Sequence, residues 1–221
     1  MPVYVTYPKK KNSFRNFSVN VNIILINLTA FILFFTLIRL NVFSIEDIAI
    51  KPANIIQGKY LWTFLTSMFM HGGFFHLFVN MFSLLFIGGL IEQLIGRKRY
   101  LWFYLISGLV AGLFFVLLSF VFPRDMDTFA VGASGALFGI SGLMVILTPN
   151  LPLYVMFIPI SIKAKYAIPG LLIILWLISF TGELPVGNTA HLGGLIAGLI
   201  YGIYLKTKYK RKTAYINRYF S

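Results

Sequence analysis

The chain has 221 residues, of which 58% are hydrophobic and 11% charged, and its mean hydropathy is +0.84. A soluble domain averages about 25% charged residues, so this composition excludes a protein whose main solvent is water. The net charge of +13 raises the possibility of nucleic-acid binding, and the absence of cysteine excludes disulfides, thiolate metal sites and a cysteine nucleophile.

The first predicted element is a membrane-spanning helix over residues 19–40, after a basic segment over residues 1–18. That segment carries Lys9, Lys10, Lys11 and Arg15. A signal peptide has an apolar core of about 7 to 15 residues, whereas the run from 19 to 40 is long enough to cross a bilayer. We therefore expect an uncleaved signal anchor behind a cytoplasmic N-terminal segment.

Five further stretches are apolar enough to be spans or nearly so, and two of them, 133–147 and 166–182, are short. The five stretches are 74–95, 100–122, 133–147, 166–182 and 189–205. The segment 151–162 contains Pro152 and Pro159 and is too short to span, so we predict a loop at the membrane interface. The sequence thus predicts an all-α membrane protein with a six-helix bundle over residues 19–205, followed by a basic tail over residues 206–221.

The placement of the charges tests this topology independently. Fifteen of the 19 basic residues fall on one side of the predicted membrane: Lys9, Lys10, Lys11, Arg15, Arg97, Lys98, Arg99, Lys163, Lys165, Lys206, Lys208, Lys210, Arg211, Lys212 and Arg218. The opposite side carries five of the six acids: Glu46, Asp47, Asp125, Asp127 and Glu183. By the positive-inside rule, both termini are cytoplasmic, as in a multi-pass protein of the cell membrane.

This scatter of basic residues over four segments disfavours nucleic acid as a partner and indicates a topology signal instead. The tail over residues 206–221 either contacts anionic lipid headgroups or is a solvated stop signal, and we favour the second interpretation. Membrane lipids are expected to surround the predicted spans over residues 19–205.

Four polar side chains are expected at a similar shallow depth in the membrane. His76 and Asn80 lie early in the second predicted span, four residues apart and so on one helix face. Ser134 opens the fourth span and His191 lies early in the sixth. All three spans enter the membrane from the outer side, and ionisable groups inside a membrane are costly enough to indicate function.

Glycines at helical spacing predict close contact between the helices that carry Ser134 and His191. The fourth span has Gly135, Gly139 and Gly142 after Gly132, and the sixth has Gly194, Gly198 and Gly202. Small residues four apart let helix backbones approach closely. Such ladders are common in membrane helices without chemistry, so this spacing supports packing and does not by itself establish catalysis.

These residue types suit nucleophilic catalysis. A serine needs a base within hydrogen-bond reach, and His191 is the better candidate for the base of Ser134. His76 and Asn80 would then donate to the developing oxyanion, together with the backbone N–H of Ser134. No acid completes a triad, because Glu92 lies about 18 Å deeper than Asn80 at roughly 1.5 Å per residue. We therefore expect a Ser/His dyad and a structural Glu92 that hydrogen-bonds neighbouring backbone.

Three segments carry a resemblance to a known family: WTFLTSMFMHGGFFHLFVNMFSL (62–84), GASGALFG (132–139) and AHLGGLIAG (190–198). Together they resemble the rhomboid proteases. The resemblance implies a six-helix bundle that cuts single-pass transmembrane proteins near the outer face, with Ser134 and His191 as the dyad and His76 and Asn80 at the oxyanion. It also implies catalysis without a metal, nucleotide or other cofactor. A lateral gate in the fifth span, which contains Trp176, is a further implication.

The chain departs from the family pattern at three positions, none of which removes a catalytic group. Thr63 stands where many relatives have arginine, and Phe138 stands where many have tyrosine. Val186 occupies a position that is usually glycine. These changes bear on the first outer loop and on the packing where the sixth span begins.

Two other classes of protein remain as alternatives. A catalytically silent rhomboid relative would bind membrane proteins without cutting them, but such relatives typically lack the serine or the histidine, and this chain has both. A small transporter or channel would use His76 and His191 as a proton relay. It would be expected to show inverted repeats and broken helices, which the sequence does not display.

Overall fold

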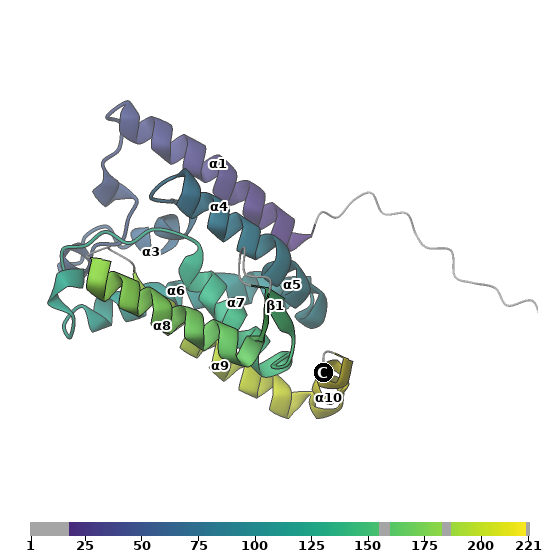
Figure 1. The fold of residues 1–221 in the computed structure, drawn as a ribbon. Helices are drawn as coiled ribbons and strands as arrows, with labels where there is room; N and C mark the ends of the chain where they lie inside the picture. The colour runs from purple at the N-terminus through teal and green to yellow at the C-terminus, as the bar shows by residue number, and fades with distance from the viewer. Residues whose placement is uncertain (1–17, 155–159, 183–186, 220–221) are drawn as a thin grey trace, which may run out of the picture.

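The computed structural model describes residues 18–154, 160–182 and 187–219 (Figure 1). Four features of the sequence analysis lie outside these residues: the basic cluster from Lys9 to Arg15, Pro159, Glu183 and Val186. The elements in chain order are α1 (Val19–Arg39), η1 (Ile45–Asp47), α2 (Pro52–Ile56), α3 (Thr63–Thr66), η2 (Ser67–Phe69), α4 (Phe74–Ser83), η3 (Leu84–Gly88), α5 (Gly89–Ile95), α6 (Arg97–Leu118), η4 (Pro123–Asp125), α7 (Ser134–Leu147), β1 (Pro152–Tyr154), β2 (Ser161–Lys163), α8 (Ala164–Gly182), α9 (Asn188–Lys208) and α10 (Lys210–Tyr219).

A helix occupies each of the six ranges named from the sequence. The second range is one continuous helix made of α4, the π-helical turn η3, and α5. The largest difference in bounds concerns the range 100–122, where α6 begins at Arg97 and ends at Leu118. Gly96 has a φ of 86° and separates α5 from α6, while Pro123 disfavours helical backbone just before it.

Four helices of the described chain are long and apolar enough to cross a membrane. These are Val19–Arg39, Phe74–Ile95, Arg97–Leu118 and Ala164–Thr181. The shorter α7 is also apolar, with 14 residues. The helix in the sixth predicted range, α9, has 21 residues. It begins with polar side chains and ends with lysines, which lowers its mean hydropathy. The chain is therefore a membrane-embedded helical protein.

Two segments contain regular structure that the sequence analysis did not predict. The sequence analysis predicted a loop over residues 151–162. In the structure β1 pairs antiparallel with the start of β2 inside this segment, with Leu153 opposite Ile162, so the loop prediction is wrong there. This pairing satisfies backbone groups that an irregular loop would leave open. Much of the basic tail forms α10. Thr213 and Ile216 lie three residues apart and so share one face of this helix, and both side chains are buried against the bundle.

The central helix is α7, because every residue from 135 to 144 is buried. Its glycines face those of α9 so closely that a Cβ atom at Gly194 would overlap the carbonyl oxygen of Gly135. A Cβ atom at Gly198 would likewise overlap the carbonyl oxygen of Gly139. The backbones of these two helices are therefore in direct contact, as the glycine spacing predicted.

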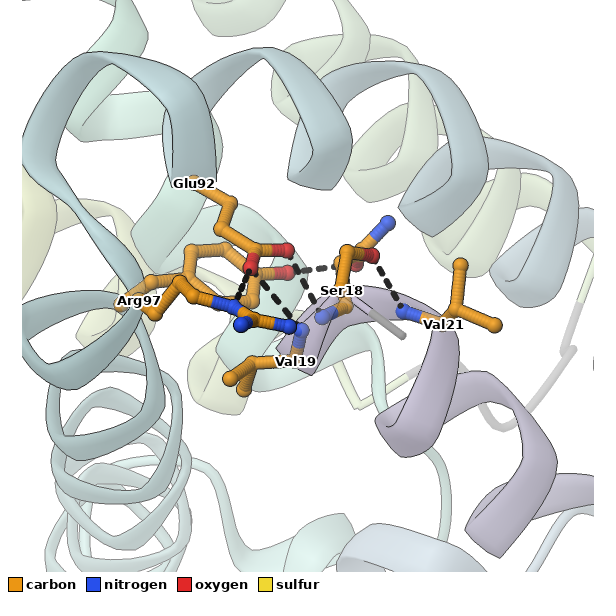
Figure 2. A network of polar contacts seen from close by, with 7 residues as sticks. Ser18, Val19, Val21, Glu92 and Arg97 are labelled. Carbon is orange, nitrogen blue, oxygen red and sulfur yellow. Dashed lines mark hydrogen bonds and ion pairs between the residues drawn. The ribbon is translucent and has the colours of Figure 1, made fainter. Parts of the chain in front are cut away.

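Glu92 holds the start of α1 against α5 (Figure 2). Its two carboxylate oxygens accept hydrogen bonds from the backbone N–H groups of Val19 at 2.8 Å and Asn20 at 2.9 Å. Arg97 lies 3.5 Å from the same carboxylate, and the Ser18 hydroxyl accepts from the Val21 N–H. Glu92 therefore satisfies the open donors of a helix N-terminus, and the backbone that it binds belongs to α1.

The side chain of Asn20 reaches into the π-helical turn. Its amide donates to the carbonyl of Leu84 at 2.7 Å, and its oxygen accepts from the Tyr100 hydroxyl at 2.6 Å. Gly88 leaves the space for both side chains, since a Cβ atom there would lie 2.5 Å from the Tyr100 oxygen. An inserted side chain of this kind is a known cause of local distortion in a helix.

We expect Glu92→Gln to destabilise the fold by about 2–3 kcal/mol, because a neutral amide replaces a buried carboxylate that accepts two backbone hydrogen bonds. Reversible unfolding in mixed micelles measures this loss. Glu46→Gln is the matched control. Glu46 lies in η1, and its carboxyl group makes no hydrogen bond or ion pair among the described residues. Equal stability of the two variants would show that the Glu92 charge does not anchor α1.

Candidate active site

Ser134 and His191 form a hydrogen-bonded pair. The Oγ atom of Ser134, the first residue of α7, lies 2.8 Å from Nε2 of His191 in the first turns of α9. The Nδ1 atom of His191 is buried and has no hydrogen-bond partner among the described residues. A neutral imidazole in this geometry accepts the serine proton at Nε2, which is the arrangement of a nucleophile and its base.

The ring of Phe138 fixes one face of the His191 imidazole. The two rings are stacked, with centroids 4.6 Å apart and an interplanar angle of 22°. Phe138 lies four residues after Ser134, so α7 places both the serine and this ring beside the histidine. The phenyl ring at position 138 therefore packs against His191 without a hydroxyl group.

The start of α9 is tied to its neighbours by two hydrogen bonds that the sequence analysis did not foresee. The hydroxyl of Thr189 donates to the carboxylate of Asp125 in η4 at 3.0 Å. The amide of Asn188 donates to the carbonyl of Leu175 in α8 at 3.3 Å. Partial burial raises the pKa of the Asp125 carboxyl, and the Thr189 hydroxyl opposes that rise. Both contacts position the turn that carries His191.

His76 lies across a small gap from Ser134. Its Nδ1 atom accepts a hydrogen bond from the backbone N–H of Gly72 at 3.4 Å, so in the neutral ring the proton belongs on Nε2. The Nε2 atom points toward the turn before α7. A Cβ atom built on Gly132 would lie 2.9 Å from it and 3.7 Å from the Ser134 oxygen. Glycine at position 132 therefore keeps this gap open.

Asn80 borders the same cavity but is not hydrogen-bonded to the serine or the base among the described residues. Its amide donates to the carbonyl of His76 at 2.8 Å, one turn earlier in α4. One N–H of this amide remains for a further acceptor. The structure thus places Asn80 at the same cavity as His76, one turn later in α4.

His71 is a neighbour of the site that the sequence analysis did not use. Its buried ring packs edge-on against His76, with centroids 5.2 Å apart, and against Phe31 of α1. Its Nε2 atom lies 3.5 Å from the backbone nitrogen of Ala133, next to Ser134. The signal in the sequence was a second histidine five residues before His76.

These groups open on a cavity of about 970 Å³. Ser134, His191, His76 and Asn80 all line it, and so do apolar residues of α8, including Leu171. A space of this size is large enough for a short peptide segment. The cavity therefore combines a candidate nucleophile, a candidate base and candidate oxyanion donors with an apolar wall.

We expect Gly132→Ala to reduce catalysis at least about 100-fold, because the added methyl group fills the gap where His76 meets a developing oxyanion. Gly96→Ala is the matched control, since Gly96 also has a positive φ but has open space around it. Initial cleavage rates of the two variants, beside their unfolding midpoints, separate backbone strain from lost catalysis. Similar rates for both would mean that the gap is not used.

The apolar helices and the partly buried serine–histidine pair describe a membrane-embedded protein with a candidate catalytic site of the kind found in serine hydrolases. Residues 58–208 match the model of the rhomboid domain, so the chain belongs to the rhomboid family. It is 38% identical over 164 residues to RHOMBOID-like protein 5 of Arabidopsis thaliana, covering 73% of this chain and 50% of that protein.

Two further relatives differ in what their names say of activity. The inactive RHOMBOID-like protein 8 of Arabidopsis thaliana is 35% identical over 146 residues, or 65% of this chain and 38% of that protein. The putative rhomboid protease YdcA of Bacillus subtilis (strain 168) is 28% identical over 162 residues, or 72% of this chain and 74% of that protein. The chain thus spans half or less of the two plant proteins.

Proposed function

We propose that this protein is an intramembrane serine endopeptidase that cleaves transmembrane proteins near the outer face of the membrane. The observation that carries the proposal is the 2.8 Å contact between Ser134 Oγ and His191 Nε2 at the wall of a cavity. A serine with a histidine at this distance is activated for attack on a carbonyl carbon.

The residues have the following roles in this mechanism. Ser134 Oγ attacks the scissile carbonyl while His191 Nε2 accepts its proton, and the same nitrogen then gives the proton to the leaving amine. His76 Nε2–H, the free amide N–H of Asn80 and the backbone N–H of Ser134 stabilise the oxyanion. Water, activated by His191, then hydrolyses the acyl-enzyme and restores the Ser134 hydroxyl.

The proposed topology has six membrane spans with both termini in the cytoplasm. The proposed location is the plasma membrane. Its parts are a cytoplasmic segment over residues 1–18, a membrane domain over 19–205 and a cytoplasmic tail over 206–221. The excess of basic residues at one set of helix ends supports this orientation. Addition of a membrane-impermeant thiol reagent to single-cysteine variants at residues 59 and 206 tests it, because the chain has no cysteine of its own.

The substrate enters, in this proposal, beside α8, where apolar residues line the cavity. Trp176 of α8 packs edge-on against Phe122, with ring centroids 5.3 Å apart. Separation of these two rings is the proposed gate. The substrate is a single-pass protein whose helix unwinds near its outer end, because a protease needs extended backbone.

A silent relative that binds membrane proteins without cutting them is the second candidate, and the name of one plant relative favours keeping it. The serine–histidine contact argues against it. Reconstitution of the purified protein in liposomes with a labelled single-pass model substrate separates the two. Cleavage mapped by mass spectrometry near the outer boundary supports the protease, whereas binding with no cleavage of several substrates supports the silent relative.

We expect the cleavage rate to fall as the pH is lowered through the pKa of His191, because a protonated imidazole has no lone pair to accept the Ser134 proton. The ordinary pKa of histidine is about 6.5. The value of kcat/KM is measured between pH 4 and pH 8 in liposomes with equal pH on both sides. A flat profile over this range would count against His191 as the base.

A further inference from the structure

Seven exposed basic side chains gather at the end of the bundle opposite the candidate active site. They come from the start of α6 and from the region where α9 meets α10: Lys98, Arg99, Lys206, Lys208, Lys210, Arg211 and Lys212. We call this surface the basic end. Two contacts join its parts, from Arg99 to the Tyr209 hydroxyl at 2.8 Å and from Lys212 to the Leu94 carbonyl at 3.5 Å. Figure 1 shows α10 at the same end of the molecule as α5.

Among the residues that the structure describes, none of these seven cations is paired with an acidic side chain. Of the six acids in the chain, Glu183 lies outside the described residues, and four lie in the segments that follow the far ends of α1 and α6. The sixth, Glu92, is 5% exposed and is occupied by the start of α1 and by Arg97. The basic end therefore presents a concentrated positive potential that an external anion relieves.

Two of the cations are held in place by a shared aromatic ring. Arg99 lies over the ring of Tyr209, 5.1 Å from its centroid. Lys208 lies 5.9 Å from the centroid of the same ring and donates to the Tyr204 hydroxyl at 2.7 Å. A topology signal requires charge alone, whereas these contacts pre-order a guanidinium and an ammonium around one ring. That arrangement suits a phosphate group, which accepts from both.

The helix α10 adds a cationic face that is turned away from the protein. Its apolar side is already used, because Thr213 and Ile216 are buried against the bundle. The outer side carries Lys210 and Arg211 together with Tyr215, which is 72% exposed. An exposed tyrosine among basic residues is typical of the interface between a membrane and water.

We propose that the basic end binds the phosphate headgroups of anionic phospholipids, with Arg99 and Lys208 at its centre and α10 as its outer wall. The chemistry is that of a phosphodiester, and the occupant is a lipid because the surface lies at the ends of membrane-spanning helices. This binding goes beyond the proposed protease activity and holds whether or not the protein cleaves substrates.

Thermal unfolding of the full chain in one non-ionic detergent, titrated with short-chain phosphatidylglycerol, tests the proposal. We expect a saturable rise in Tm that is absent with phosphatidylcholine of the same chain length and lost in 0.5 M salt. Inorganic phosphate and polyglutamate should each act at least about tenfold more weakly. Equal effects of both phospholipids would overturn lipid specificity, equal potency of inorganic phosphate would indicate a free-anion site, and equal potency of polyglutamate would indicate an acidic peptide.

Two double variants locate the site. Lys210→Gln/Arg211→Gln changes only exposed residues, and Arg99→Gln/Lys208→Gln removes the ordered pair. Each should weaken phosphatidylglycerol binding roughly 25-fold, at about 1 kcal/mol per cation near a lipid surface. Arg39→Gln/Lys59→Gln removes two charges at the opposite end and should leave binding unchanged. Binding by Lys210→Gln/Arg211→Gln equal to that of the wild type, or equal loss in the control, would overturn the assignment even if the other variant fails to fold.

Discussion

Ser134→Ala and His191→Ala should each lower the rate of cleavage of a transmembrane substrate by at least about 10⁴-fold, while the fold is retained. The two side chains act as one unit, so removal of either eliminates the same step and the double variant should be no slower than each single one. The residual rate would come from substrate binding and the oxyanion donors. Cleavage in liposomes, followed by gel and mass spectrometry, gives the rates.

A matched control is available in the same helix. Ser141 is a buried serine of α7, two turns after the partly buried Ser134, and has no contact with His191 among the described hydrogen bonds. Ser141→Ala should cleave within about threefold of the wild type. If Ser134→Ala and His191→Ala cut as fast as this control, the catalytic assignment is wrong; if no variant and no wild type cuts several bound substrates, the silent relative is favoured.

Gly194→Ala and Gly198→Ala should each destabilise the bundle by at least about 2 kcal/mol and abolish cleavage. The new methyl group would overlap a backbone carbonyl oxygen of α7, which cannot rotate away as a side chain would. The two helices must then separate, and Ser134 and His191 separate with them. Unfolding midpoints in detergent measure the first effect, and cleavage rates in liposomes measure the second.

Gly170→Ala provides the control for these substitutions. Gly170 is also inside a helix, α8, and nothing lies within 4 Å of a Cβ atom built there. This variant should be neutral or more stable by up to about 1 kcal/mol, because alanine favours the helix. Equal stability of Gly198→Ala and Gly170→Ala would mean that α7 and α9 tolerate a wider spacing than their contacts indicate.

The positions of the main helices could be predicted from the sequence because the apolar runs are long. In a membrane the backbone of such a run must satisfy its own hydrogen bonds, which favours a helix. The glycine contacts could also be predicted, because the spacing of residues along a helix fixes which of them share a face. His76, Ser134 and His191 could be named because their helices all start at one side. The family followed from the same motifs. Their catalytic roles stay predictions until cleavage is measured.

The tertiary structure alone decided how the site is held together. Asp125 and Thr189 are 64 residues apart, and Glu92 binds a helix start more than 70 residues earlier, so no local pattern encodes either contact. His71 was visible in the sequence, but its approach to Ala133 depends on how two loops fold against each other. The pairing of β1 with β2 and the docking of α10 likewise depend on packing. The sequence determined which helices form and which side chains they carry, because those are local and periodic properties; distances between side chains on different helices follow only from the packed structure.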